Sequence, residues 1–258
     1  MAQKMTSTPQ ECIRMGIIYL FDVDGTLTPA RQPMDDSFRT FFLQLCGQAQ
    51  VYLITGSDRP KLDEQVPPNV RASVEGIFTC AGCQFWKAED LIFERTHEFD
   101  PKLVQALEGF VASSPFDGRF GNHMEFRTGM INVSVPGRNV SKEGRQRYYE
   151  WDKQQGERQA FIKTLNDQFP DYSVSAGGQI SIDVSPLGWT KAQILKHLKN
   201  WHPKAKFIFF GDRMNEGGND RPLALALEVD SPQHRSVSVD GPQNTLIALK
   251  DLFTPTSE

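Results

Sequence analysis

The residues best suited to chemistry are two aspartates, Asp22 and Asp24, at the end of a short apolar run that begins at Ile17. This β-branched and aromatic run predicts a buried strand. Side chains two residues apart in a strand point to the same side, so the two carboxylates should lie together. Neighbouring carboxylates repel each other unless a cation or a shared proton intervenes. The pattern therefore predicts a divalent-metal site in which one carboxylate is available as a nucleophile.

A polar turn is the alternative interpretation, because Asp and Gly are also ordinary turn residues. Gly25 permits a sharp turn, and Thr26 and Thr28 add hydroxyls beside the acids. The complete string DVDGTLT resembles the first motif of the haloacid-dehalogenase-like (HAD) phosphotransferases. In that family the first Asp is phosphorylated, and the second is a general acid/base whose carbonyl also binds Mg²⁺. The resemblance implies these roles for Asp22 and Asp24.

Three later positions carry polar side chains at the ends of predicted strands or the start of a predicted helix. Ser57 follows a strand at residues 51–54, Lys191 begins a helix at 191–201, and Asp212 follows a strand at 206–210. Taken singly, each is equally well a turn residue or a solvated helix start. Their order matches the four HAD motifs, which implies that Ser57 holds the phosphoryl group and Lys191 neutralises its charge. The implied metal ligands are Asp22, Asp24 and Asp212, the last preferred over Asp220 in the same loop.

The order of predicted elements indicates two domains. Strands alternate with helices up to residue 80 and again after residue 190, which predicts an α/β, Rossmann-like, doubly wound parallel sheet with ligands at the carboxyl ends of its strands. Between these parts, hairpin-like strand pairs at 124–133 and 172–184 and helices at 101–113 and 142–169 predict an inserted α+β cap. We expect the core at residues 1–86 and 187–258 and the cap at 87–186.

The cap segment is rich in arginine, the side chain that grips phosphate with two parallel hydrogen bonds. The arginines concerned are Arg119, Arg127, Arg138, Arg145 and Arg147. A solvated basic face paired with glutamates such as Glu143 and Glu150 is the plainer interpretation of such a cluster.

Two strings in the cap favour the phosphate-binding interpretation. FRTGMINVS, followed by Gly137 and Arg138, and GGQISIDV, followed by Gly188 and Trp189, are very similar to the cap of eukaryotic-type phosphomannomutases. The similarity runs collinearly over nearly the whole chain. It implies a HAD core with a type IIB-like cap, and substrate contacts from Arg31, Arg127, Arg138, Arg145, Ser181 and Asp183.

The resemblance also implies an activity. It would be a Mg²⁺-dependent interconversion of mannose 6-phosphate and mannose 1-phosphate, feeding GDP-mannose synthesis through a phosphoaspartate and a hexose 1,6-bisphosphate. That bisphosphate would also prime the enzyme, and the family forms homodimers through the cap. Two alternatives stay open: a HAD-type sugar-phosphate phosphatase, in which water intercepts the phosphoaspartate, and a non-catalytic sugar-phosphate-binding protein.

Composition limits the partners. The 258 residues include 28 Lys and Arg against 32 Asp and Glu, a net charge of −4 that gives no global attraction to nucleic acid or an anionic membrane. The four cysteines, Cys12, Cys46, Cys80 and Cys83, are too few for a disulfide framework and fit a reducing cytoplasm. Cys80 and Cys83 form a C-x-x-C with no further ligand pair for zinc, and we interpret them as incidental thiols rather than a redox pair.

Overall fold

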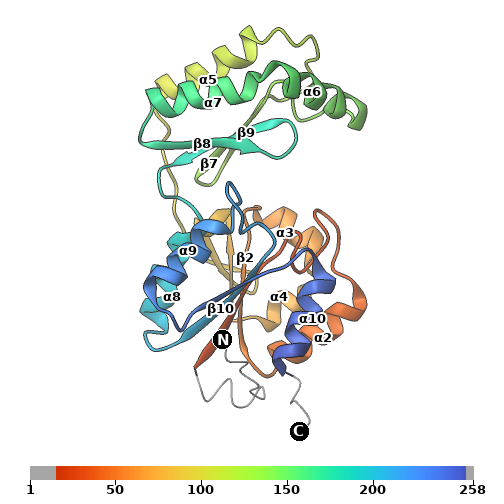
Figure 1. The fold of residues 1–258 in the computed structure, drawn as a ribbon, viewed down its shortest axis with the longest axis vertical. Coiled ribbons are helices and arrows are strands. Elements are labelled where there is room, and N and C mark those ends of the chain that lie inside the picture. Colours follow the sequence, from red (N-terminus) through yellow and green to blue (C-terminus); the bar gives the residue numbers. More distant parts are fainter. Residues whose placement is uncertain (1–15, 254–258) are drawn as a thin grey trace. The chain divides into compact units, whose positions relative to one another are not determined.

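The computed structural model describes residues 16–253 and divides the chain into two compact units (Figure 1). Unit 1 comprises Met1–Glu94 and Thr190–Glu258, and unit 2 is Arg95–Trp189. These borders differ from the expected ones at 86/87 and 186/187. The strands expected at 85–86 and 91–93 continue the sheet of unit 1 rather than beginning the cap, so the insertion follows this hairpin and not the third strand.

Unit 1 is built on a seven-stranded sheet in the order β11-β10-β1-β2-β3-β4-β5. Five parallel strands form its centre and one edge: β11 (Arg235–Ser238), β10 (Lys206–Gly211), β1 (Ile17–Asp22), β2 (Gln50–Ile54) and β3 (Gly76–Thr79). The hairpin β4 (Gln84–Lys87) and β5 (Asp90–Glu94) adds two antiparallel strands. The predicted doubly wound, mostly parallel core is confirmed.

Strand β1 is buried on both faces, as expected for a central strand of a parallel sheet. Tyr19 and Phe21 pack into one core with α2 (Asp36–Cys46), α3 (Arg59–Gln65), α4 (Pro68–Ser73) and α10 (Pro242–Phe253). Ile18 and Leu20 pack into a second core with α8 (Ile194–Trp201) and α9 (Arg221–Asp230). Each large apolar side chain buried in this way contributes about 1.5–3 kcal/mol. The strand end that carries the aspartates is therefore held rigidly from two sides.

Two helices of unit 1 were not predicted, α4 and α9. Helix α4 has only six residues and begins at a proline pair, too short a stretch to show a 3.6-residue period. The helix predicted at 191–201 begins as a 3₁₀ turn, Lys191–Gln193, before α8.

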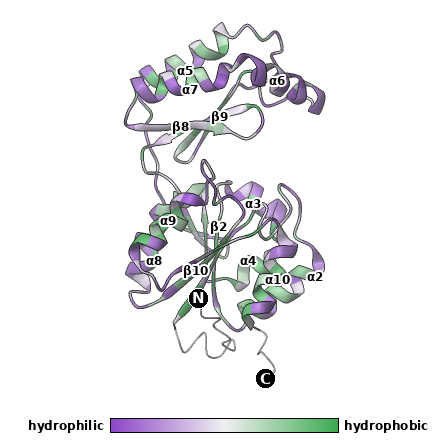
Figure 2. Cartoon of the chain, in the orientation of Figure 1, coloured by the Kyte–Doolittle hydropathy of each residue, from purple (hydrophilic) through white to green (hydrophobic). Residues whose placement is uncertain are grey.

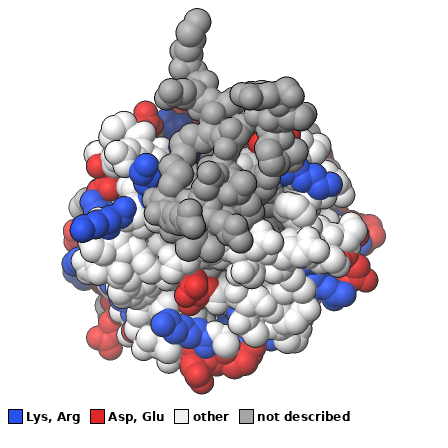
Figure 3. Space-filling view, turned by 90° about the horizontal axis from the view of Figure 1, so that it is seen from below, with Lys and Arg blue, Asp and Glu red and all other residues white. Residues whose placement is uncertain are grey.

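Among residues 16–253 no helix has the length and apolar character needed to cross a membrane. On the face drawn in Figure 3, acidic and basic side chains are interspersed rather than gathered by sign.

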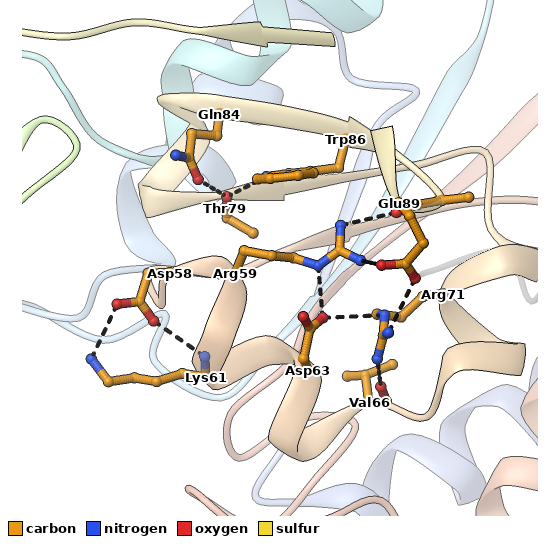
Figure 4. Close-up of polar contacts among 11 residues, drawn as sticks. Asp58, Arg59, Lys61, Asp63, Val66, Arg71, Thr79, Gln84, Trp86 and Glu89 are labelled. Carbon is orange, nitrogen blue, oxygen red and sulfur yellow. Dashed lines mark hydrogen bonds and ion pairs between the residues drawn. The ribbon is translucent and has the colours of Figure 1, made fainter. Parts of the chain in front are cut away.

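Helix α3 is tied to its neighbours by a ring of four charged side chains (Figure 4). Arg59 lies 2.6 Å from Asp63, pairs with Glu89 and donates to the carbonyl of Ala88 at 2.9 Å. Arg71, on α4, lies 3.2 Å from Asp63 and 3.1 Å from Glu89. Both arginines are more than nine-tenths buried. The ring joins α3, α4 and the turn between β4 and β5.

Unit 2 has a four-stranded antiparallel sheet in the order β6-β7-β9-β8, formed by β6 (Met124–Arg127), β7 (Met130–Ser134), β9 (Ser181–Pro186) and β8 (Tyr172–Gly177). One face packs apolar side chains against α5 (Pro101–Ser113), α6 (Lys142–Gln155) and α7 (Glu157–Gln168). The single helix predicted at 142–169 is two, because Gly156 takes a left-handed conformation with φ 68° and ends α6. Figure 2 shows α6 to be mostly hydrophilic.

Candidate active site

The centre of the site is a buried lysine between two aspartates. Asp22 ends β1 and is 3% exposed, and Lys191 is 1% exposed. The Lys191 ammonium donates to Asp22 and, at 2.6 Å, to Asp220, which is completely buried. A buried charge is tolerated only when it is paired and hydrogen-bonded, and this ammonium meets that condition twice. The predicted residues Asp22 and Lys191 are thus brought into direct contact.

Asp212 completes a cluster of three carboxylates. One oxygen each of Asp22, Asp212 and Asp220 lies within 4.8 Å of the others. Asp212 Oδ1 is buried without a hydrogen-bond partner among the described residues. A Cβ on Gly25 would lie 2.3 Å from the Asp212 carboxylate, so only glycine allows this approach. A buried, unpartnered carboxylate oxygen beside two more carboxylates suits a hard divalent cation, and the donor set fits Mg²⁺.

The charge of this carboxylate cluster also favours a bound cation. Three carboxylates face one ammonium, so the described side chains carry surplus negative charge. Burial raises the pKa of Asp22 to about 7, with Asp220 and Asp212 acting in the same direction and Lys191 against it. Burial, followed by Asp220, also raises the pKa of Asp212. Burial alone would lower the pKa of Lys191, but Asp22 and Asp220 together raise it. Each group is driven to keep or take up a proton, and a bound cation would remove that need.

The second predicted carboxylate, Asp24, has its own set of partners. Its Oδ1 accepts from Gln65 Nε2 at 2.8 Å and from the backbone N–H of Arg31 at 2.9 Å. Its Oδ2 accepts from the Ser57 hydroxyl at 3.4 Å, a long contact. Ser57 comes just before Asp58, the N-cap residue of α3, and Gln65 is the last residue of that helix, so the two ends of one short segment reach the two oxygens. Asp24 is held in place by its surroundings, separately from the lysine cluster.

Unit 2 presents a polar face on the side of its sheet opposite the helices. Asn132 pairs across the sheet with Glu125 on β6 and Asp183 on β9. Its amide nitrogen donates to Asp183 and, at 3.0 Å, to Ser181. Its oxygen accepts from Arg138 at 2.7 Å. The predicted side chains Arg138, Ser181 and Asp183 therefore meet around Asn132.

The remaining predicted arginines have different surroundings. Arg127 pairs with Glu125 on the same polar face. The Arg145 side chain, on the first turns of α6, has no hydrogen bond or ion pair among residues 16–253. The Arg31 side chain is exposed, and its backbone has φ 58°, an uncommon conformation for a residue other than glycine.

Two arginines of the predicted cluster serve local structure instead. Arg119 donates to the carbonyls of Val111, Ser114, Phe116 and Gly118, which fixes the loop after α5. Arg147 pairs with Asp117 and lies over the Phe116 ring at 5.2 Å. No disulfide joins the described cysteines Cys46, Cys80 and Cys83, and Cys12 lies outside the described residues.

Four residues that contact the predicted side chains were not predicted themselves: Asp220 and Gln65 in unit 1, and Glu125 and Asn132 in unit 2. Asp220 was considered and passed over for Asp212, although both belong to the cluster. Gln65 gave no signal, because a glutamine at the end of a short helix is ordinary. Strand alternation was the usable signal for Glu125 and Asn132, since both fall on the face that also carries Arg127 and Asp183.

The fold itself is that of the haloacid-dehalogenase-like phosphohydrolases. The trehalose-6-phosphate phosphatase C-terminal domain of C. albicans superposes with a TM-score of 0.64 at 18% identity, covering 98% of each chain. A haloacid dehalogenase-like hydrolase from Bacteroides thetaiotaomicron gives a TM-score of 0.61 at 13% identity, covering 92% of this chain and 99% of that one. At such identities the likeness establishes the fold alone.

Sequence comparison identifies the family within this fold class. A family model described as eukaryotic phosphomannomutase matches residues 38–255. The phosphomannomutase of Saccharomyces cerevisiae is 35% identical over 92% of this chain and 94% of its own length. That of Solanum lycopersicum is 33% identical over 93% and 95%. The chain belongs to the eukaryotic phosphomannomutase family, as its cap strings predicted.

Proposed function

We propose that this protein is a Mg²⁺-dependent phosphomannomutase that interconverts mannose 6-phosphate and mannose 1-phosphate. The observation that carries the proposal is the buried contact of Lys191 with Asp22 at the end of β1, inside a chain of the phosphomannomutase family. A nucleophilic carboxylate with an adjacent fixed ammonium suits phosphoryl transfer, in which positioning and charge stabilisation supply most of the catalysis.

In this proposal Asp22 carries the phosphoryl group. A hexose 1,6-bisphosphate primes the enzyme: an Asp22 oxygen bonds to phosphorus, the bond from phosphorus to the sugar oxygen breaks, and Asp24 gives that oxygen a proton. For turnover, the free hydroxyl of a hexose monophosphate attacks the phosphoaspartate while Asp24 accepts its proton. This step regenerates the Asp22 carboxylate and forms the bisphosphate. Transfer back from the other phosphate completes the isomerisation.

The metal belongs to the same proposal. Asp22 and Asp212 would hold Mg²⁺, with Asp24 as the third predicted ligand and Asp220 beside them. When bound, the ion would neutralise charge on the phosphoryl oxygens. Lys191 supplies a second positive charge at Asp22, and the Ser57 hydroxyl, which makes a long contact with Asp24, would bind the phosphoryl group.

Substrate recognition is assigned to arginines and to the polar face of unit 2. Arg31, Arg127, Arg138 and Arg145 would bind the phosphate that is not transferred. Ser181 and Asp183 would bond sugar hydroxyls. Support comes from the network around Asn132, which already orients Arg138, Ser181 and Asp183.

We also infer that the protein works in a reducing cytoplasm, which its few cysteines fit, and that it forms a homodimer through unit 2. The edge strand β6 exposes 60% of Phe126, and Phe120 just before it is 48% exposed. Exposed aromatic side chains at a sheet edge are common in subunit interfaces. Light scattering of the wild type and of Phe126→Ser tests this, since the variant should shift toward monomer. If Phe126→Ser has the same mass in solution as the wild type, β6 does not form the interface.

The decisive test is a coupled assay with Mg²⁺ and a catalytic amount of glucose 1,6-bisphosphate. We expect mannose 1-phosphate to be converted to mannose 6-phosphate without stoichiometric phosphate release. Asp22→Asn should abolish turnover, because the amide is no nucleophile, whereas Arg138→Ala should mainly raise KM. Phosphate release without isomerisation would identify a phosphatase. Ligand binding without turnover, unaffected by Asp22→Asn, would identify a binding protein.

A further inference from the structure

The carboxylate of Glu125 forms ion pairs with two of the arginines that are assigned to phosphate binding. Glu125 Oε2 lies 2.6 Å from Arg127 Nη2 and 2.7 Å from Arg138 Nη2. The Glu125, Arg127 and Arg138 side chains are only 30%, 15% and 28% exposed, so this is no freely solvated surface pair. Two guanidinium groups that share one carboxylate oxygen are close enough to be bridged by a single tetrahedral anion.

The strand register explains why Glu125 occupies this position. Glu125 and Arg127 are two residues apart on β6 and so lie on the same face of the sheet. Glu125 is paired with Asn132, whose oxygen accepts from Arg138 Nη1 at 2.7 Å. Arg138 is therefore gripped by Asn132 on one nitrogen and by Glu125 on the other. Its guanidinium plane is set before any ligand arrives.

Charge gives Glu125 a second effect. Two guanidinium groups at this separation repel each other, and one carboxylate between them removes that repulsion and neutralises one of the two positive charges. Phosphate would then meet an assembled clamp with reduced charge. A mutase must release its bisphosphate from the clamp and bind it again by the other phosphate, which an over-tight clamp would slow.

We propose that Glu125 is a positioning residue that assembles Arg127 and Arg138 into a phosphate clamp and limits how tightly the clamp holds phosphate. This assignment rests on the proposed function. It predicts opposite effects for two substitutions. Glu125→Gln keeps a bridging acceptor but loses the charge, so it should bind phosphate more tightly. Glu125→Asp keeps the charge but is too short to reach both arginines, so it should bind phosphate more weakly.

Calorimetric titration with inorganic phosphate, in the absence of Mg²⁺, measures this directly. Relative to wild type we expect about fivefold tighter binding for Glu125→Gln, the factor for one unit charge removed at about 4 Å in water. The difference should shrink as salt is raised. Arg138→Ala, which removes one arm of the clamp, should lose most of the binding. Glu150→Gln, the same charge change at an exposed position of α6, should match wild type.

Steady-state kinetics then separates this inference from the function. With an active wild type, Glu125→Gln should lower both KM and kcat, because release becomes slow. Wild-type phosphate affinity and kinetics in both Glu125 variants would overturn the clamp assignment while leaving the mutase standing. A wild type without isomerase activity, together with opposite phosphate affinities in the two variants, would overturn the mutase and retain the clamp. If Glu125→Gln does not fold, Glu125→Asp decides alone, and affinity equal to or above wild type refutes the proposal.

Discussion

Replacing Arg59 by Met should destabilise unit 1 by about 3 kcal/mol, because Arg59 is a buried member of the ring of four charged side chains (Figure 4). Methionine keeps the length of the aliphatic stem but removes the guanidinium. The side chain of Arg59 is only 9% exposed, and its guanidinium lies 4.7 Å from the centre of the Trp86 ring. The loss therefore includes contacts that water cannot replace.

The magnitude follows from the individual contacts. The Ala88 carbonyl loses its donor, which costs about 1 kcal/mol. Loss of the cation–π contact with Trp86 costs about 1 kcal/mol. The Asp63 and Glu89 side chains are 39% and 64% exposed and keep Arg71 as a partner, so each lost ion pair costs about 0.5 kcal/mol.

Urea unfolding at pH 7.5, fitted with one transition for each unit, measures the effect. Lys61→Met is the matched control on the same helix, because Lys61 has a side chain that is 37% exposed, against 9% for Arg59, and forms a single long ion pair with Asp58 at 3.6 Å. This control should lose less than about 0.5 kcal/mol. A loss below about 1 kcal/mol in Arg59→Met, or equal losses in both variants, would refute the idea that burial gives the ring its strength.

Three further outcomes are expected. Gln65→Leu removes the donor at 2.8 Å from Asp24 Oδ1 and should lower kcat about tenfold at similar KM; an unchanged kcat would count against this positioning. Mg²⁺ at ten times its Kd should stabilise the protein by about 1.4 kcal/mol in thermal unfolding, an effect absent from Asp212→Asn; an equal shift in the variant would contradict the ligand assignment. Burial lowers the pKa of His202 below the unfolded value of 6.5. The unfolded state then binds the proton more readily, so stability should be full above pH 6.5 and fall as the pH drops through and below that value. His202→Gln should show a flatter pH profile between 7.5 and 5.5, at the expense of the bond to Tyr52; identical profiles would contradict it.

Local chemistry made part of the site predictable. The apolar run of β1 predicts a buried central strand, and Asp22 and Asp24 place two carboxylates where it ends. These features were predictable because burial and side-chain alternation depend on only a few neighbouring residues. The contact of Lys191 with Asp22 joins residues 169 apart in the chain, and only the order of motifs suggested it. Asp212 was preferred to Asp220 as a metal ligand, but the loop conformation brings both carboxylates into the same cluster. That conformation could not be predicted from the residue types alone.

Boundaries were harder to predict than elements. The β4–β5 hairpin gives the same local signal in either unit, and only its pairing with β3 decides where it belongs. Gly156 was assigned to a continuous helix because a single glycine in a polar helical stretch carries little periodicity; its left-handed backbone ends the helix. Long-range pairing and backbone conformation decided these cases, and neither can be read from composition.

The strand order of unit 1 has a consequence for how the chain acquires its structure during synthesis. Strand β1 pairs with β10, which begins at Lys206, beyond the whole of unit 2. Unit 2 closes on itself, with Arg95 over the Trp189 ring at 3.8 Å where its chain enters and leaves. Contacts between distant segments form slowly and wait for the later one to emerge from the ribosome. We therefore expect unit 2, with its four-stranded sheet, to fold first. Until Lys191 and β10 have been synthesised, strand β1 and Asp22 at its end stay exposed and need protection from aggregation.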